Sequence, residues 1–124
     1  MNFDLSDDHA LLQRTVRDFA EQEVAPVAAE LDRTKAFPYD LVHKLGQLNL
    51  MGIPFPEEYG GAGADTLAYA IAVEELTRVD SSVAITLCAH TSLGTQPIYL
   101  FGTEEQKQRW LPDLCAGRKL GSFR

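Results

Sequence analysis

The chain has 124 residues, a length that suits a single domain, and 45% of them are hydrophobic and 23% charged, as in globular proteins with a packed core. Its net charge of −7 argues against a nucleic-acid partner, and no basic amphipathic segment points to a membrane surface. The acidic residues 1–8 have neither an apolar signal region nor the character of a transit peptide, so we expect a cytoplasmic protein.

The first predicted helix begins at Ser6, a good N-cap, and has Asp7 and Asp8 in its first turn. Apolar residues then recur at helical spacing as far as Leu31. Pro26 lies within this run and is expected to kink or interrupt the helix, because proline lacks the N–H donor and crowds the turn before it.

Residues 36–50 predict a second helix, with Pro38 in its first turn. The next residues, 51–65, are dense in proline and glycine and predict a loop. Three more helices are expected to begin at capping residues, namely Asp65, Asp80 and the capping box Thr103–Gln106. We therefore predict an all-α domain, a helical bundle of five to six helices. The one strand signal is Leu120–Phe123, a nascent strand at the C-terminus that would have no partner within the chain.

Residues 81–103 contain no Asp, Glu, Lys or Arg. Polar residues interrupt this stretch, so its uninterrupted apolar part is too short to span a membrane. The pattern favours two buried helical pieces, broken near Gly94–Pro97, at the centre of the bundle. Their polar groups then need partners, either core neighbours or a ligand in a pocket. Ile85, Ala89 and Leu93 fall on one face of the helix, because they are four residues apart.

Other motifs predict structure rather than chemistry. The glycine-rich residues 60–65 resemble a dinucleotide fingerprint only faintly and follow no strand, so a structural turn is favoured. Glu74 and Glu75 are adjacent on a helix and within reach of Arg78, which favours a solvated, salt-bridged face over an acid–base pair. The scattered histidines and cysteines lack metal-ligand spacing: His9, His43, His90, Cys88 and Cys115. We expect the cysteines to be reduced core thiols, and no catalytic group is evident.

Three stretches of the sequence together resemble the N-terminal helical domain of the acyl-CoA dehydrogenases: FAEQEVAPVAAELDR, IPFPEEYGGAGAD and the run from AIAVEELTRVDSS to LPDLCAGRKLGSF. The resemblance runs from about Leu5 to Phe123 and covers nearly the whole of 1–124. Members of this family have three domains, bind FAD non-covalently and oxidise acyl-CoA thioesters to 2,3-enoyl-CoA. The resemblance implies an acyl-CoA substrate, a homo-oligomeric full-length protein and an electron-transfer protein as acceptor.

In the family, the segment that matches Gly121–Phe123 continues into the first strand of a middle β-domain, which a C-terminal helical domain follows. Here Arg124 departs from the family's small residue and ends the sequence. The chain therefore resembles a truncated member or a fragment. Because the catalytic glutamate and most of the flavin site have no counterpart here, we expect the isolated chain to be inactive and not to hold FAD tightly.

The resemblance also implies site residues. The positions that match the family's acyl-chain pocket are Ile85, Thr86, Ala89 and Leu93. Phe123 matches an aromatic position beside the flavin. Two alternatives stay open from the residues alone. Ile85 and Leu93 could pack in the core of an isolated domain, and the chain could be an inactive helical module that binds another protein through an exposed apolar face.

Overall fold

The computed structural model describes residues 1–123. In chain order the elements are α1 (Asp7–Phe19), η1 (Ala20–Val24), α2 (Ala25–Thr34), α3 (Tyr39–Gln47), η2 (Glu57–Tyr59), α4 (Thr66–Thr77), α5 (Ser81–Cys88), η3 (Ala89–Thr95), α6 (Gln96–Phe101) and α7 (Glu104–Cys115). The α1–η1–α2 run and the α5–η3–α6 run are each one continuous helix, so the described chain has five helices apart from the single turn η2. The predicted all-α class is confirmed.

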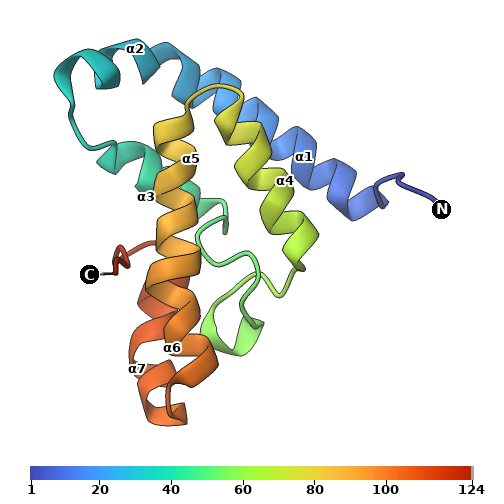
Figure 1. The fold of residues 1–124 in the computed structure, drawn as a ribbon, viewed down its shortest axis with the longest axis vertical. Coiled ribbons are helices and arrows are strands. Elements are labelled where there is room, and N and C mark those ends of the chain that lie inside the picture. The colour runs from blue at the N-terminus through green and yellow to red at the C-terminus, as the bar shows by residue number, and fades with distance from the viewer. Residues whose placement is uncertain (124) are drawn as a thin grey trace.

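Helices α1, α4 and α5 pack side by side, and α6 and α7 form a hairpin at the opposite end of the molecule (Figure 1). The main core lies between α1, α3, α4, α5 and the loop after α3. Its buried residues are Val16, Phe19, Ala20, Val24, Leu41, Val42, Leu45, Leu50, Met51, Ile53, Ala68, Ala72, Leu76, Val83, Ala84 and Leu87. A smaller cluster joins the loop to α7 through Phe55, Tyr59, Leu111 and Cys115. The loop is therefore part of the interior.

The predicted helix starts are confirmed. The side chains of Ser6, Asp65 and Asp80 each accept a hydrogen bond from a backbone N–H in the first turn of α1, α4 and α5. The capping box at the start of α7 is complete, because Thr103 Oγ1 accepts from the Gln106 N–H while the Gln106 side chain accepts from the Thr103 N–H. These caps satisfy backbone donors that a helix leaves free at its N-terminus.

Neither proline breaks its helix, contrary to the expectation for Gly94–Pro97 and for an interruption at Pro26. A π-helical segment comes directly before each of them: η1 precedes Pro26, and η3 precedes Pro97. A π turn is wider than an α turn. The proline ring therefore does not clash with the carbonyl of the preceding turn, and that carbonyl does not depend on the N–H that proline lacks. In η3 the hydroxyl of Thr95 also donates to the carbonyl oxygen of His90, at 2.8 Å.

The glycine-rich residues 60–65 form a structural turn that folds back on the start of the same loop. The backbone N–H groups of Ala62, Gly63 and Ala64 donate to carbonyl oxygens of residues 52–55 at 2.8–2.9 Å. A Cβ atom on Gly61 would lie 2.1 Å from the Phe55 oxygen, so only glycine fits there. These N–H groups are therefore not free to bind a phosphate.

Glu75 is buried, which corrects the expectation of a solvated face. It is 1% exposed, whereas its neighbour Glu74 is exposed. Arg17 on α1 donates two hydrogen bonds to its carboxylate, at 2.9 and 2.8 Å, and Arg78 donates a third at 2.9 Å. These guanidinium groups lower the pKa of Glu75. The helix-face pattern missed this because the main partner comes from another helix.

The strand predicted at Leu120–Phe123 is not formed, because no neighbouring strand exists among residues 1–123. Gly121 instead donates its N–H to a side chain, as described below. The helices of residues 1–123 include none with the length and hydrophobicity that crossing a lipid bilayer requires.

Candidate functional site

The α5–η3–α6 helix has two different sides, although both are free of charge. One side enters the main core through Val83 and Leu87, each 0% exposed. The other side carries Ile85, which is 61% exposed, and Leu93, which is 52% exposed. The expectation that this helix is buried all round is therefore wrong for one side, and so is the core alternative for Ile85 and Leu93. An exposed apolar stripe of this kind is typical of a binding surface.

Thr86 and Ala89 lie half-buried on the same helix. The hydroxyl of Thr86 donates to the Ser82 carbonyl at 2.9 Å, so it is satisfied within α5. We call the set of Ile85, Thr86, Ala89 and Leu93 the open face. The four residues predicted for the acyl-chain pocket thus lie on one helix, and none of them is charged.

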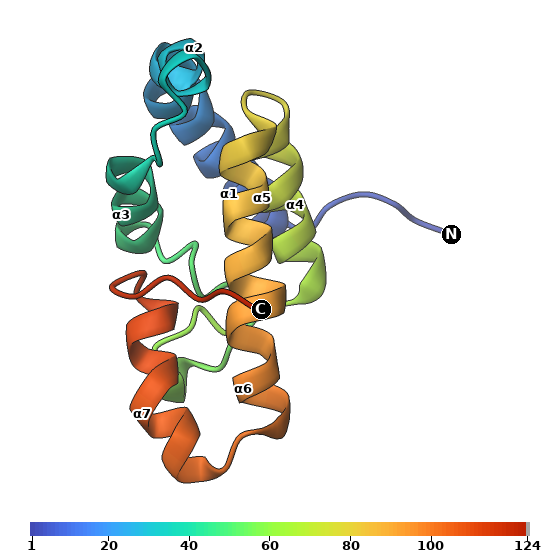
Figure 2. The same ribbon diagram turned by 60° about the vertical axis from the view of Figure 1, so that its left-hand side comes forward.

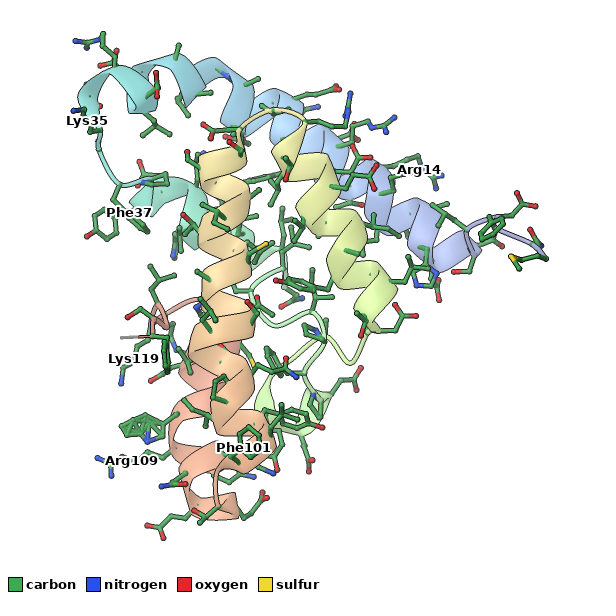
Figure 3. All side chains as sticks on the ribbon, in the orientation of Figure 1. Arg14, Lys35, Phe37, Phe101, Arg109 and Lys119 are labelled. Atoms are coloured by element: carbon green, nitrogen blue, oxygen red, sulfur yellow. The ribbon has the colours of Figure 1, made fainter. Side chains whose placement is uncertain are left out.

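The upper end of the open face borders a groove of about 400 Å³. Residues of α5, among them Ile85 and Thr86, line one side of this groove. The end of α2 and the α2–α3 connection, on which Figure 3 labels Lys35 and Phe37, line the other. Phe37 is 39% exposed and contacts Tyr39 edge to face. The groove is therefore lined by apolar side chains such as Ile85 and Phe37, and its lining also includes a carboxylate, Asp32, and a cation, Lys35.

Phe123 is 73% exposed. The segment before it, which follows α7, crosses the α5–η3–α6 helix (Figure 2). The crossing is a close backbone contact between Gly121 and Gly94. A Cβ on Gly94 would lie 2.5 Å from the Gly121 carbonyl carbon, and a Cβ on Gly121 would lie 2.9 Å from the Gly94 Cα. Because Leu93 precedes Gly94, the crossing brings the segment that ends at Phe123 to the helix that carries the open face.

His90 lies directly beneath this crossing, although the sequence indicated only a histidine without metal-ligand spacing. It is 0% exposed. Its Nε2 lies 2.9 Å from the Leu114 carbonyl oxygen, and its Nδ1 lies 2.9 Å from the Gly121 nitrogen. Burial lowers the pKa of His90, because an imidazolium loses its hydration there. One signal in the sequence was the position of His90 in a charge-free helix, where a polar side chain needs a partner.

A tyrosine–carboxylate contact ties the loop to α7. The hydroxyl of Tyr59 donates to both carboxylate oxygens of Glu104, at 2.8 and 3.0 Å. This hydrogen bond raises the pKa of Tyr59 to about 12 and lowers that of Glu104. The phenol therefore stays protonated at neutral pH and serves as a structural link.

Comparisons with known proteins agree with this geometry. The family described as "Acyl-CoA dehydrogenase, N-terminal domain" matches residues 6–118. The short-chain-specific acyl-CoA dehydrogenase of Clostridium acetobutylicum is 51% identical over 123 residues, which cover 99% of this chain and 32% of that protein. The chain thus spans about a third of the length of the curated relatives it matches.

Two solved structures have the same fold. One, described as "Electron transferring flavoprotein of Acidaminococcus fermentans: Towards a mechanism of flavin-based electron bifurcation", has a TM-score of 0.93 and 44% identity over 97% of this chain and 32% of that chain. The other, an acyl-CoA dehydrogenase from Bacillus anthracis complexed with FAD, has a TM-score of 0.84 and 40% identity over 95% of this chain and 20% of that chain. The chain described here belongs to the acyl-CoA dehydrogenase family, as its N-terminal helical domain.

Proposed function

We propose that this chain is the N-terminal domain of an FAD-dependent acyl-CoA dehydrogenase and that its open face forms one wall of the acyl-chain pocket. The observation that carries the proposal is the two-sided character of the α5–η3–α6 helix. One side is packed in the core, whereas Ile85 and Leu93 on the other side stay exposed without a charged neighbour on the face. Burying an acyl chain against such a wall contributes about 0.8 kcal/mol for each methylene.

The open face offers contact and no acid–base chemistry. Abstraction of a proton next to a thioester carbonyl needs a positioned base and stabilisation of the enolate that forms. The Ile85, Ala89 and Leu93 side chains carry no proton acceptor, and the Thr86 hydroxyl is engaged by the Ser82 carbonyl. We therefore place the catalytic base outside this chain, in the rest of the longer protein.

Phe123 is the residue we assign to the flavin. Its exposed ring presents apolar aromatic surface, which can pack beside a flavin ring but cannot bind a pyrophosphate. The turn at residues 60–65 cannot do so either, because its N–H groups are already paired with loop carbonyls. When bound, FAD supplies the acceptor for the hydride that leaves the β-carbon. We propose that most contacts to FAD come from parts of the protein outside this chain.

The 51%-identical relative acts on short chains by name, which favours a short acyl-CoA as substrate here. An electron-transferring flavoprotein is the proposed acceptor, because a structure described by that name contains a chain 44% identical to this one. A homo-oligomer of the full-length protein stays part of the proposal. The alternative of an inactive interaction module gains no support from the comparisons.

A direct test compares this chain with the longer protein that carries it. The longer protein, purified, should be yellow, and its flavin absorbance should bleach when butyryl-CoA is added. The isolated 124-residue chain should stay colourless after incubation with FAD and gel filtration, and it should not convert the thioester. A longer protein that binds no flavin, or that binds flavin without bleaching by any acyl-CoA, would contradict the proposal.

A further inference from the structure

Three segments that are far apart in the sequence meet at His90. The imidazole comes from η3, the carbonyl of Leu114 from the last turn of α7, and the N–H of Gly121 from the segment after α7. Both hydrogen bonds are 2.9 Å long, and the ring is fully buried. A buried imidazole with both nitrogens engaged by backbone groups holds those groups at a fixed separation.

The partners of His90 determine its tautomer. A carbonyl oxygen can only accept, so Nε2 must carry the proton that it donates to Leu114. A backbone N–H can only donate, so Nδ1 must be the unprotonated nitrogen that accepts from Gly121. The neutral Nε2–H form is therefore the one form of the ring that satisfies both partners.

The same segment is held at a second point by steric fit. Gly121 and Gly94 approach so closely that neither position has room for a Cβ atom, which would lie 2.5 Å or 2.9 Å from backbone atoms of the other glycine. A hydrogen bond to His90 and a glycine–glycine contact therefore act on one residue, Gly121. Both contacts hold the segment after α7 against η3 at Gly121, two residues before Phe123.

We propose that His90, as the neutral Nε2–H tautomer, is a positioning residue that anchors the segment after α7 across η3 and thereby sets the position of Phe123 relative to the open face. The anchoring is a property of this chain alone. Only the role of Phe123 beside a flavin rests on the proposed function.

Matched variants of His90 separate anchoring from packing. His90→Asn keeps an oxygen acceptor near the place of Nδ1 but is too short to reach Leu114. His90→Gln places an amide near Nε2 but leaves Gly121 without an acceptor. His90→Phe keeps the ring volume and loses both hydrogen bonds. The rank order of the three variants therefore distinguishes the two roles.

The measurement is hydrogen exchange by NMR on the ¹⁵N-labelled 124-residue chain, with the exchange rate of the Gly121 amide divided by that of the core amide of Leu87 in the same variant. We expect Gly121 to exchange by local opening and Leu87 by global unfolding, so the Leu87 rate, reported beside the ratio, shows how much of any change comes from global stability. We expect Gly121 to be protected in the wild type and in His90→Asn, and to exchange roughly tenfold faster in His90→Gln and His90→Phe. Gly94→Ala should also release Gly121, with His90 left intact.

Equal protection of Gly121 in all variants would overturn the proposal. So would the packing order, in which His90→Phe keeps the protection and His90→Asn loses it. The exposed His43→Gln serves as the control and should leave the ratio unchanged.

The wild type alone provides an independent check that does not depend on any variant folding. Long-range ¹H–¹⁵N correlation at pH 7 should report a protonated Nε2 and an unprotonated Nδ1 for His90. The opposite tautomer, or an imidazolium, would contradict the proposal. A failure of the proposed enzymatic function would leave both NMR results unchanged, so the two can be told apart.

Discussion

The two sides of the α5–η3–α6 helix are alike in having no charged residue, but one side is buried in the core and the other is exposed. Val83, Leu87 and His90 are fully buried, whereas Ile85 and Leu93 are more than half exposed. Both sides lack charge, so composition alone does not tell them apart. Burial separates the two sides: one packs in the core and stabilises the domain, and the other leaves apolar side chains exposed, which we propose are covered by an acyl chain.

The largest expected effect is on the buried side. Leu87→Ala removes a fully buried side chain from the main core and should lower the free energy of unfolding by roughly 2–5 kcal/mol. Urea denaturation of the isolated chain, followed by circular dichroism, measures this. A loss below about 1 kcal/mol would mean that the core collapses around the cavity or that this side is not packed as described.

An intermediate effect concerns pH and again belongs to the buried side. The pKa of His90 is lowered by burial, so the unfolded chain binds a proton at a higher pH than the native chain does. The contribution to stability is fully present above the ordinary pKa of 6.5 and is lost as the pH falls through the lowered pKa of the folded state. The carboxylates whose pKa is lowered in the folded state contribute stability that is lost only at lower pH, below the ordinary pKa of 4.5 in the case of Glu75.

Unfolding free energies at pH 7.5 and pH 5 should therefore differ more in the wild type than in His90→Phe, which cannot titrate at this position. Subtracting the two curves removes the shared contribution of the carboxylates. Identical pH dependence in the two proteins would show that His90 is not buried and neutral in the native state.

The smallest expected effect is on the exposed side. Leu93→Ala truncates a side chain that is 52% exposed, so the isolated chain should change in stability by less than about 0.5 kcal/mol. Leu87→Ala and Leu93→Ala are the same substitution in the same helix, so they differ only in whether the side chain lies on the buried or the exposed side. A loss as large as that of Leu87→Ala would erase the distinction between the two sides.

The sequence predicted the parts of the fold that depend on neighbours in the chain. The caps at Ser6, Asp65 and Asp80 were predictable because a capping side chain contacts backbone two or three residues away. The shared face of Ile85, Ala89 and Leu93 followed from helical periodicity alone. The exposure of this face could not be predicted from periodicity, because exposure depends on which other helices pack around it.

The features that the sequence analysis missed depend on partners distant in the chain. Arg17 and Glu75 are 58 residues apart, and His90 and Gly121 are 31 apart. The continuity of the two long helices through Pro26 and Pro97 was missed for another reason. Proline is read as a helix breaker, and the π segments that accommodate it have no simple composition signal.

We propose that the open face borders the acyl chain, and Ala89 is the position at which to test this because it lies half-buried between Ile85 and Leu93. In the longer protein, kcat/KM is measured for a series of acyl-CoA chain lengths with Ala89→Phe, together with the melting temperature. Ala28→Phe, at a half-buried alanine of α2, is the matched control.

A phenyl ring at this position should shift selectivity toward shorter chains by roughly 0.8 kcal/mol, about fourfold, for each methylene that it blocks, and the control should leave the profile unchanged. A lower melting temperature with an unchanged chain-length profile would instead mean that Ala89 packs between helices and that the open face borders no acyl chain.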